Sequence, residues 1–182
     1  MRYYPSLCLL VVFFGLWGCT LVRPPQIETS GPRVYLGPTG PIEADRTFCI
    51  STFEAQTDQL GAAIARIYRD ALLEVHLPVK IRLLKGRPIL KGQRLKGCDY
   101  ILLGRINYLL PPAPTGGGAV ETEIEIYSLP RWTPYLHLEE SATVPYGTYG
   151  EYPPGIDIRT GPAPSAATVI KLMAEHLGQI LY

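Results

Sequence analysis

The sequence predicts an α/β (α+β) domain, a two-layer sandwich in which a mixed sheet of about five strands carries both helices on one face. Two stretches have apolar residues at the three- and four-residue spacing of an amphipathic helix, and the stretches between them are rich in β-branched or alternating residues. A helix joins the first two strands, which should therefore lie parallel, and short links make the last three antiparallel. The expected order is β-α-β-β-β-β-α.

The first half of the domain combines a strand, a helix and a second strand. In order, we expect a strand at 47–53, a helix at 58–76, a strand at 79–84 and an irregular or helical crossover at 85–97. Thr57 or Asp58 is the expected N-cap of the helix, and Pro78 ends it. Glycines and polar residues make the crossover irregular.

The second half is expected to be a meander closed by a helix. It should hold strands at 99–110, 119–129 and 135–144, and a helix at 166–181. The apolar start of 99–110 predicts burial on both faces and thus a central place in the sheet. In the next strand, Val120, Ile124 and Ile126 alternate with glutamates and should point inward. The proline-rich segment 145–165 predicts a long loop.

The N-terminus has the pattern of an export signal followed by a cysteine for lipid attachment. Arg2 precedes an apolar run from Leu7 to Leu16, which is shorter than the roughly 20 residues that cross a membrane. The run ends in Leu16-Trp17-Gly18-Cys19, which resembles the bacterial lipoprotein signal, although Trp17 is bulky for its position. An ordinary signal peptide with an incidental cysteine is the alternative. We therefore expect a signal peptide at 1–18, a proline-rich tether at 19–45 and a single domain at 46–182. The tether is either extended or partly docked through Val34-Tyr35-Leu36.

Cys19 would carry a diacylglyceryl group and a further acyl chain such as palmitate, which anchors the protein in a membrane. Each buried methylene of such chains contributes about 0.8 kcal/mol. By analogy with other lipoproteins, in which an aspartate after the cysteine causes retention at the inner membrane, Thr20 favours the periplasmic face of the outer membrane.

Two cysteines, Cys49 and Cys98, remain in the domain, and an exported protein can form disulfides. A bridge between them would close a loop of about 50 residues and contribute roughly 3–4 kcal/mol to stability. Two buried, reduced cysteines are the alternative, and the sequence favours neither.

Charged residues suggest contact surfaces. Removing Arg2 from the 17 basic residues leaves 16, which equals the 16 acidic residues, so overall charge gives no reason to expect nucleic acid. Seven cations without an acid lie close together: Lys80, Arg82, Lys85, Arg87, Lys91, Arg94 and Lys96. They form either a solvated crossover balanced by acids nearby in space or a contact for anionic lipid, a glycan or an acidic partner.

Two further sets of residues are candidates for contacts. Glu121, Glu123 and Glu125 line one face of a strand, where Arg105 of the neighbouring strand should pair with them. Tyr146, Tyr149 and Tyr152 recur among proline and glycine, and they either fix a loop to the domain or form contact points for a partner.

The sequence contains no recognisable catalytic or metal-binding motif. His76, His137 and His176 share no metal-ligand spacing, and the ring of His176 is expected to be ordinary and partly buried. Thr115-Gly116-Gly117-Gly118 lacks the lysine that follows in a phosphate-binding loop. We therefore expect no enzyme activity, no cofactor and no metal.

One strand has a distinctive pattern, Gly97-Cys98-Asp99-Tyr100-Ile101-Leu102-Leu103-Gly104-Arg105-Ile106, and the helix before it contains Leu60-Gly61 and Asp70-Ala71-Leu72. Together with the alternating strand 121–127, it resembles the periplasmic α/β lipoprotein group that includes the curli secretion protein CsgG and the penicillin-binding-protein activator LpoB. It is also similar to the N-terminal domain of TolB. The resemblance spans 46–182 and implies a non-enzymatic domain that contacts other envelope proteins.

The sequence departs from a curli-type pore, because its links are too short or too rich in proline to add membrane strands. We therefore expect an outer-membrane-anchored periplasmic lipoprotein that binds an envelope protein partner and assists assembly. The alternative is a homo-oligomer, as a structural subunit of a secretion or surface apparatus.

Overall fold

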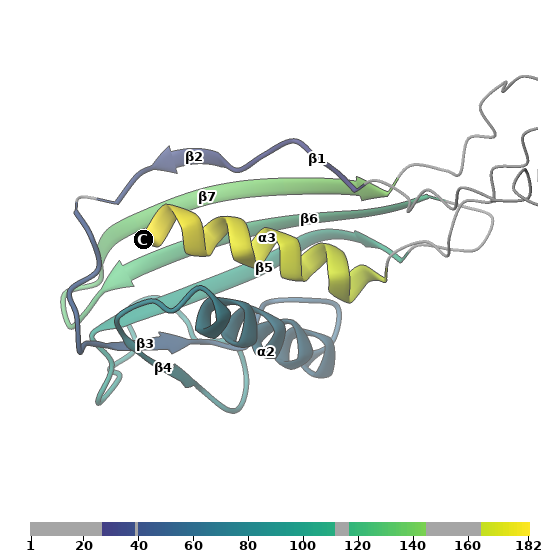
Figure 1. Ribbon diagram of the computed structural model, residues 1–182. Coiled ribbons are helices and arrows are strands. Elements are labelled where there is room, and N and C mark those ends of the chain that lie inside the picture. The colour runs from purple at the N-terminus through teal and green to yellow at the C-terminus, as the bar shows by residue number, and fades with distance from the viewer. Residues whose placement is uncertain (1–26, 39, 112–116, 145–164) are drawn as a thin grey trace, which may run out of the picture.

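The computed structural model describes residues 27–38, 40–111, 117–144 and 165–182. It shows a mixed α+β fold with two helices on a seven-stranded mixed sheet (Figure 1). The elements are β1 (Glu28–Thr29), β2 (Arg33–Leu36), β3 (Thr47–Ile50), α2 (Asp58–Glu74), β4 (Lys80–Leu83), β5 (Tyr100–Leu110), β6 (Gly118–Ser128), β7 (Thr133–Val144) and α3 (Ala166–Leu181). The strand order is β1-β7-β6-β5-β3-β4, and β2 also pairs with β7.

The sheet has two more strands than the five or so expected, so the prediction of strand number and order was wrong in this respect. β1 and β2 come from the segment expected to be a tether, and both pair antiparallel with β7. The tether thus docks at Val34-Tyr35-Leu36, but all four residues of β2 are exposed and no alternation of apolar and polar residues predicts a strand there. From β3 onward, the elements follow the expected β-α-β-β-β-β-α order.

Pairing directions within this part agree with the sequence prediction. β3 is parallel to both β4 and β5, whereas β5, β6 and β7 form an antiparallel meander. β5 lies centrally, and Ile101 and Leu102 are fully buried on its opposite faces. α2 ends at Glu74 rather than at residue 76, and His76 follows with a positive φ of 59°. The crossover after β4 contains no helix.

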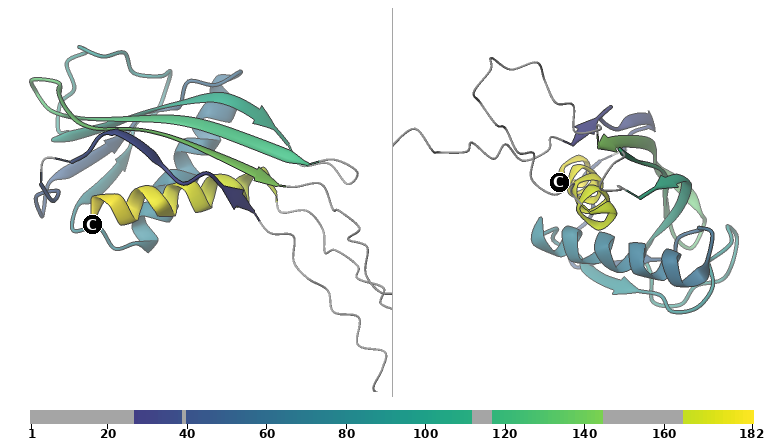
Figure 2. Two further views of the ribbon diagram at one scale, coloured as in Figure 1. Left: turned by 90° about the horizontal axis from the view of Figure 1, so that it is seen from above. Right: turned by 90° about the vertical axis from the view of Figure 1, so that its right-hand side faces the viewer.

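The main core lies between the sheet and the helix pair, around which the curved sheet wraps (Figure 2). The sheet contributes large side chains such as Phe48, Leu102 and Ile124, all fully buried. At Gly61 the helix α2 approaches the chain so closely that a Cβ would overlap the carbonyl oxygen of Phe53. Among the described residues, neither helix has the length and apolar character needed to cross a membrane.

A smaller core lies on the opposite face of the sheet, where the crossover from β4 to β5 covers Cys49 and Ile101. The connection from β3 through α2 to β4 therefore runs over one face of the sheet, and the crossover from β4 to β5 runs back over the other face. Because both the face and the direction are reversed, the two connections have the same handedness. The crossover covers only part of this face. The rest, on β6 and β7, carries charged side chains.

Candidate interaction surfaces

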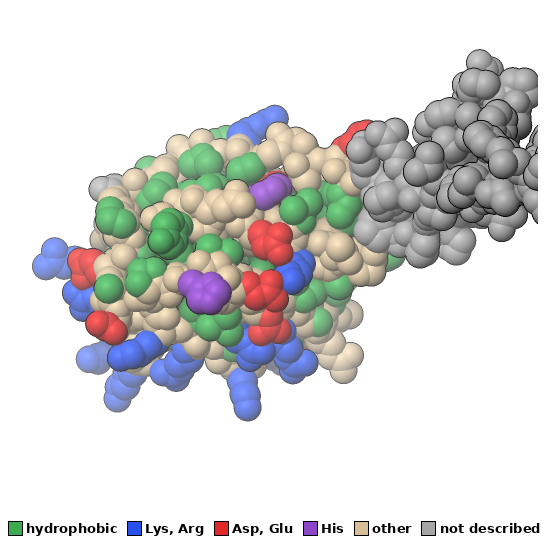
Figure 3. All heavy atoms as spheres, in the orientation of Figure 1, with side chains coloured by type: hydrophobic (Ala, Val, Ile, Leu, Met, Phe, Trp, Pro, Cys, Tyr) green, Lys and Arg blue, Asp and Glu red, His purple; other side chains and the backbone are tan. Residues whose placement is uncertain are grey.

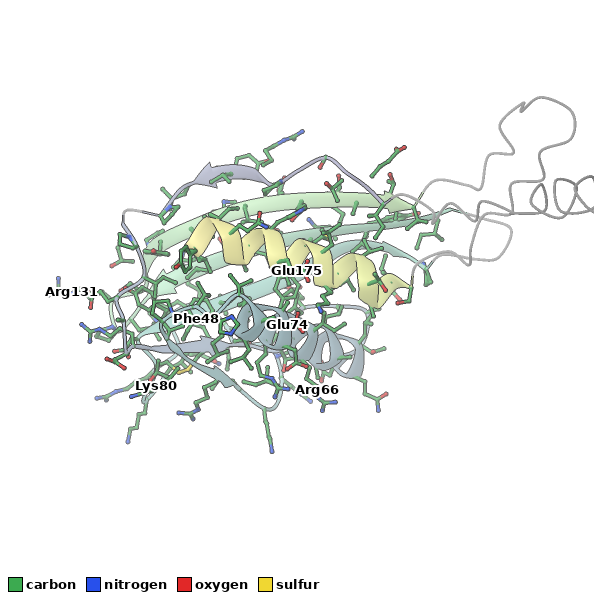
Figure 4. All side chains as sticks on the ribbon, in the orientation of Figure 1. Phe48, Arg66, Glu74, Lys80, Arg131 and Glu175 are labelled. Carbon is green, nitrogen blue, oxygen red and sulfur yellow. A yellow bond between two sulfur atoms is a disulfide. The ribbon has the colours of Figure 1, made fainter. Side chains whose placement is uncertain are left out.

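The seven cations expected near the crossover form one surface, called here the cationic ridge: Lys80, Arg82, Lys85, Arg87, Lys91, Arg94 and Lys96. All seven are exposed. On the helix side, basic side chains gather along the edge formed by β4 (Figure 3), and Lys80 points away from that strand into solvent (Figure 4). The ridge thus lies at one edge of the sheet and continues over the crossover.

The charges of the ridge are largely uncompensated. Lys91 Nζ lies 4.5 Å from the centre of the Tyr127 ring, and its hydrogen bond to Tyr127 raises the pKa of Lys91. In the part of the chain that the structure describes, none of the seven cations forms an ion pair with an acid. Acids lie nearby all the same, because Glu125 adds to the raised pKa of Lys91 and lines the same pocket as Arg87 and Lys91. Both alternatives for the ridge therefore remain open.

The crossover is irregular but held at several points. A disulfide joins Cys49 of β3 to Cys98 at the end of the crossover, with the two Cα atoms 5.7 Å apart. The amide of Ile89 donates to Ser51 Oγ at 2.9 Å, and Thr52 Oγ1 donates to the carbonyl of Gly86 at 2.8 Å. The backbone that carries the ridge is therefore tied to β3 and the residues that follow it.

The open part of the same face carries the second surface, called here the glutamate row: Glu121, Glu123 and Glu125 of β6, and Glu139 of β7. Glu123 and Glu139 lie directly opposite each other in the antiparallel register. Like charges in this arrangement repel each other. The row therefore favours a cation beside it.

Arg105 of β5 supplies one such cation. It lies opposite Glu123 in register, and its guanidinium is 3.6 Å from Glu123 and 3.0 Å from Glu54. This confirms the expected cross-strand pairing of Arg105 with the glutamates. One arginine shared between two acids leaves Glu121 and Glu139 without a cationic partner among the described residues.

Sequence spacing did not reveal a cluster in which His137 lies beside two glutamates of the row. Ligand atoms of Glu123, His137 and Glu139 lie within 4.8 Å of one another, because the register of β6 on β7 places them together. Carboxylates and imidazole can hold a divalent cation. Here His137 Nε2 is 3.1 Å from Glu123, Tyr35 donates to Glu139 at 2.6 Å, and the nearby Arg105 guanidinium disfavours a second cation.

A pocket of about 470 Å³ separates the ridge from the row. Arg87, Leu90 and Lys91 of the crossover line one side, and Arg105, Glu123 and Glu125 line the other. Its lining includes a serine, Ser51, but no histidine or cysteine. Ser51 Oγ donates to the carbonyl of Thr52 and accepts from the amide of Ile89, so its described hydrogen bonds are to the backbone rather than to a basic side chain.

A buried polar pair lies beneath α3, away from both surfaces. Glu140 of β7 is almost fully buried, and its carboxylate is 2.5 Å from Nδ1 of His176. Burial raises the pKa of Glu140, and the hydrogen bond to His176 opposes that shift. Tyr68 and Thr122 complete the polar surroundings, and burial raises the pKa of Tyr68. His176 is partly buried, as expected, but its pairing with Glu140 was not predicted.

The remaining candidates from the sequence lie outside the described residues. They are the lipid-attachment residue Cys19 and the tyrosines Tyr146, Tyr149 and Tyr152.

No protein-family profile matches this sequence, and no curated protein matches it. Two solved structures of the PelC dodecamer from Paraburkholderia phytofirmans are similar to the chain, with TM-scores of 0.54 and 0.52 at 16% and 14% identity. Each match covers 86% of this chain and 97% of that chain. A structure of the hypothetical protein CT253 from Chlamydia trachomatis matches at 10% identity with a TM-score of 0.40, too low to establish a shared fold.

Proposed function

We propose that this chain is a non-enzymatic assembly subunit of a bacterial cell envelope and that it works as a homo-oligomer. The observation that carries the proposal is the shared fold with PelC, whose structures are dodecamers, over nearly the whole of that chain. At 14% and 16% sequence identity, the similarity to PelC concerns the fold alone. The dodecameric state of PelC supports the proposal by analogy.

The charged surfaces support a role in binding rather than in catalysis. The ridge and the row are extended, and the pocket between them is lined by ion pairs and by a serine that is already hydrogen-bonded. Such a surface suits protein contacts, in which charge complementarity sets specificity and orientation.

Anchoring through Cys19 at the periplasmic face of the outer membrane completes the proposal. It rests on the Leu16-Trp17-Gly18-Cys19 signal and on Thr20. The test is fractionation of cells that express the full chain or its Cys19→Ala variant. The wild-type protein should fractionate with the outer membrane and the variant with the soluble periplasm. A variant that still follows the outer membrane would refute the anchor.

A second candidate function is binding of a different envelope protein, as the resemblance to the group of CsgG and LpoB implies. The unpaired cations of the ridge favour it, because they need an anionic partner. Affinity purification after mild crosslinking separates the two candidates. Recovery of one other envelope protein in stoichiometric amount would favour this second function, whereas crosslinked multiples of the chain alone would favour the homo-oligomer.

A further inference from the structure

Positive and negative charges are segregated on this molecule. The ridge occupies the edge strand β4 and the crossover, while the row lies on β6 and β7, on the other side of the central strand β5. Once Arg2 is removed, the basic and acidic residues balance at 16 each. The chain is therefore neutral overall but carries two surfaces of opposite sign.

Neither surface is fully paired within its own chain. None of the seven ridge cations forms an ion pair with an acid among the described residues. The row has like charges placed directly opposite each other at Glu123 and Glu139. A purely anionic ligand would suit the ridge but would be repelled by the row. A second copy of this chain supplies both complements at once.

We propose that the cationic ridge of one copy contacts the glutamate row of the next copy. This inference rests on the proposed homo-oligomer and names the surfaces that form it. Because two different surfaces meet, the contact is heterologous, and repetition of such contacts closes a ring when the rotation between copies allows it.

The centre of the ridge also offers an apolar contact. Leu90 is 69% exposed and follows Ile89 within the basic crossover. Interfaces commonly place such a side chain at their centre and charged residues around it. Leu90 would therefore be covered by the neighbouring copy, while Lys85 and Arg87 face glutamates.

The test exchanges the charges of the two surfaces in the full-length protein, purified in detergent. One variant is Lys85→Glu with Arg87→Glu, a second is Glu121→Lys with Glu125→Lys, and a third combines all four substitutions. The control is Arg66→Glu on α2, which is also exposed and has no ion pair among the described residues. Light scattering coupled to size exclusion gives the mass of each protein.

We expect the first two variants to lose the oligomer at concentrations where the wild type and the Arg66→Glu protein keep it. The combined variant should regain the wild-type mass, which also shows that the substitutions permit folding. Glu121→Lys alone provides a milder variant, because the exposed side chain of Glu121 forms no hydrogen bond or ion pair with the described residues. It should raise the concentration needed for assembly at least tenfold.

The outcomes separate this inference from the proposed function. A monomeric wild type would overturn the homo-oligomer and the interface together. A wild-type oligomer that persists in the Lys85→Glu, Arg87→Glu variant would overturn the interface alone and leave the ridge for another anionic partner. Loss in both charge-reversed variants without recovery in the combined variant would overturn the interface as well.

Discussion

Gly104 of β5 lies directly beneath the aromatic ring of Phe53. A Cβ at position 104 would overlap three carbons of that ring. Phe53 is itself fully buried and packs on Tyr68 of α2, with ring centroids 4.7 Å apart. Phe53 therefore links β5 to the helix layer, and the close contact at Gly104 is made by an aromatic ring rather than by a helix.

Gly104→Val should destabilise the domain by about 3 kcal/mol, because the added methyl groups must displace the fully buried ring of Phe53. Urea unfolding measures the change. Gly37→Ala is the control, because nothing lies within 4 Å of a Cβ at that position, and it should change the unfolding free energy by less than about 0.5 kcal/mol. Equal stability of the Gly104→Val protein and the wild type would contradict this packing.

Loss of the disulfide should also destabilise the domain. Replacing Cys49 and Cys98 together by alanine removes a link between residues 49 positions apart, which we expect to cost about 3–4 kcal/mol. Urea unfolding of the wild type with and without a thiol reductant gives the matched comparison. Identical unfolding midpoints in the two conditions would mean that the bridge contributes nothing to stability.

The buried pair predicts a pH dependence. Because burial raises the pKa of Glu140 above its usual 4.5, the folded state holds this proton more tightly than the unfolded state. The stability that this tighter proton binding contributes is fully present below pH 4.5, and it is lost as the pH rises through the folded-state pKa. Glu140→Gln removes this loss and keeps an oxygen that can accept a hydrogen bond from His176.

Relative to the Glu140→Gln protein, the wild type should therefore lose stability as the pH rises above 4.5. Urea unfolding at several pH values in this range measures it. Glu175→Gln, at a half-buried position on the same helix where the carboxylate lies 3.8 Å from Lys171, should leave the wild-type pH dependence unchanged. Parallel pH profiles for the wild type and the Glu140→Gln protein would show that the carboxylate of Glu140 is not penalised by burial.

Much of the fold follows from local sequence signals. α2 begins after Thr57, whose side chain accepts a hydrogen bond from the amide of Leu60, as an N-cap should. β6 alternates buried Ile124 and Ile126 with half-buried glutamates, because only one of its faces meets the helices. For β2, the sequence indicated Val34-Tyr35-Leu36 as a docking point of the tether but did not predict a strand, since the free edge of β7 rather than an alternating pattern makes it one.

The surfaces, too, include features that the sequence predicts and features that it does not. The ridge could be predicted because its cations lie close together in the sequence. The contacts of His137 with Glu123 and of His176 with Glu140 could not, because strand register and helix packing bring those residues together. The pairing of Arg105 with Glu123 could be predicted in part. The meander places their strands side by side, but the exact register comes from the structure.

The mass of the wild-type protein in detergent is the most direct test of the proposed homo-oligomer. The full-length chain, extracted from membranes and measured by light scattering across a range of concentrations, should give a single species with several times the mass of one chain. A protein that remains a monomer at every concentration would contradict the proposed homo-oligomer.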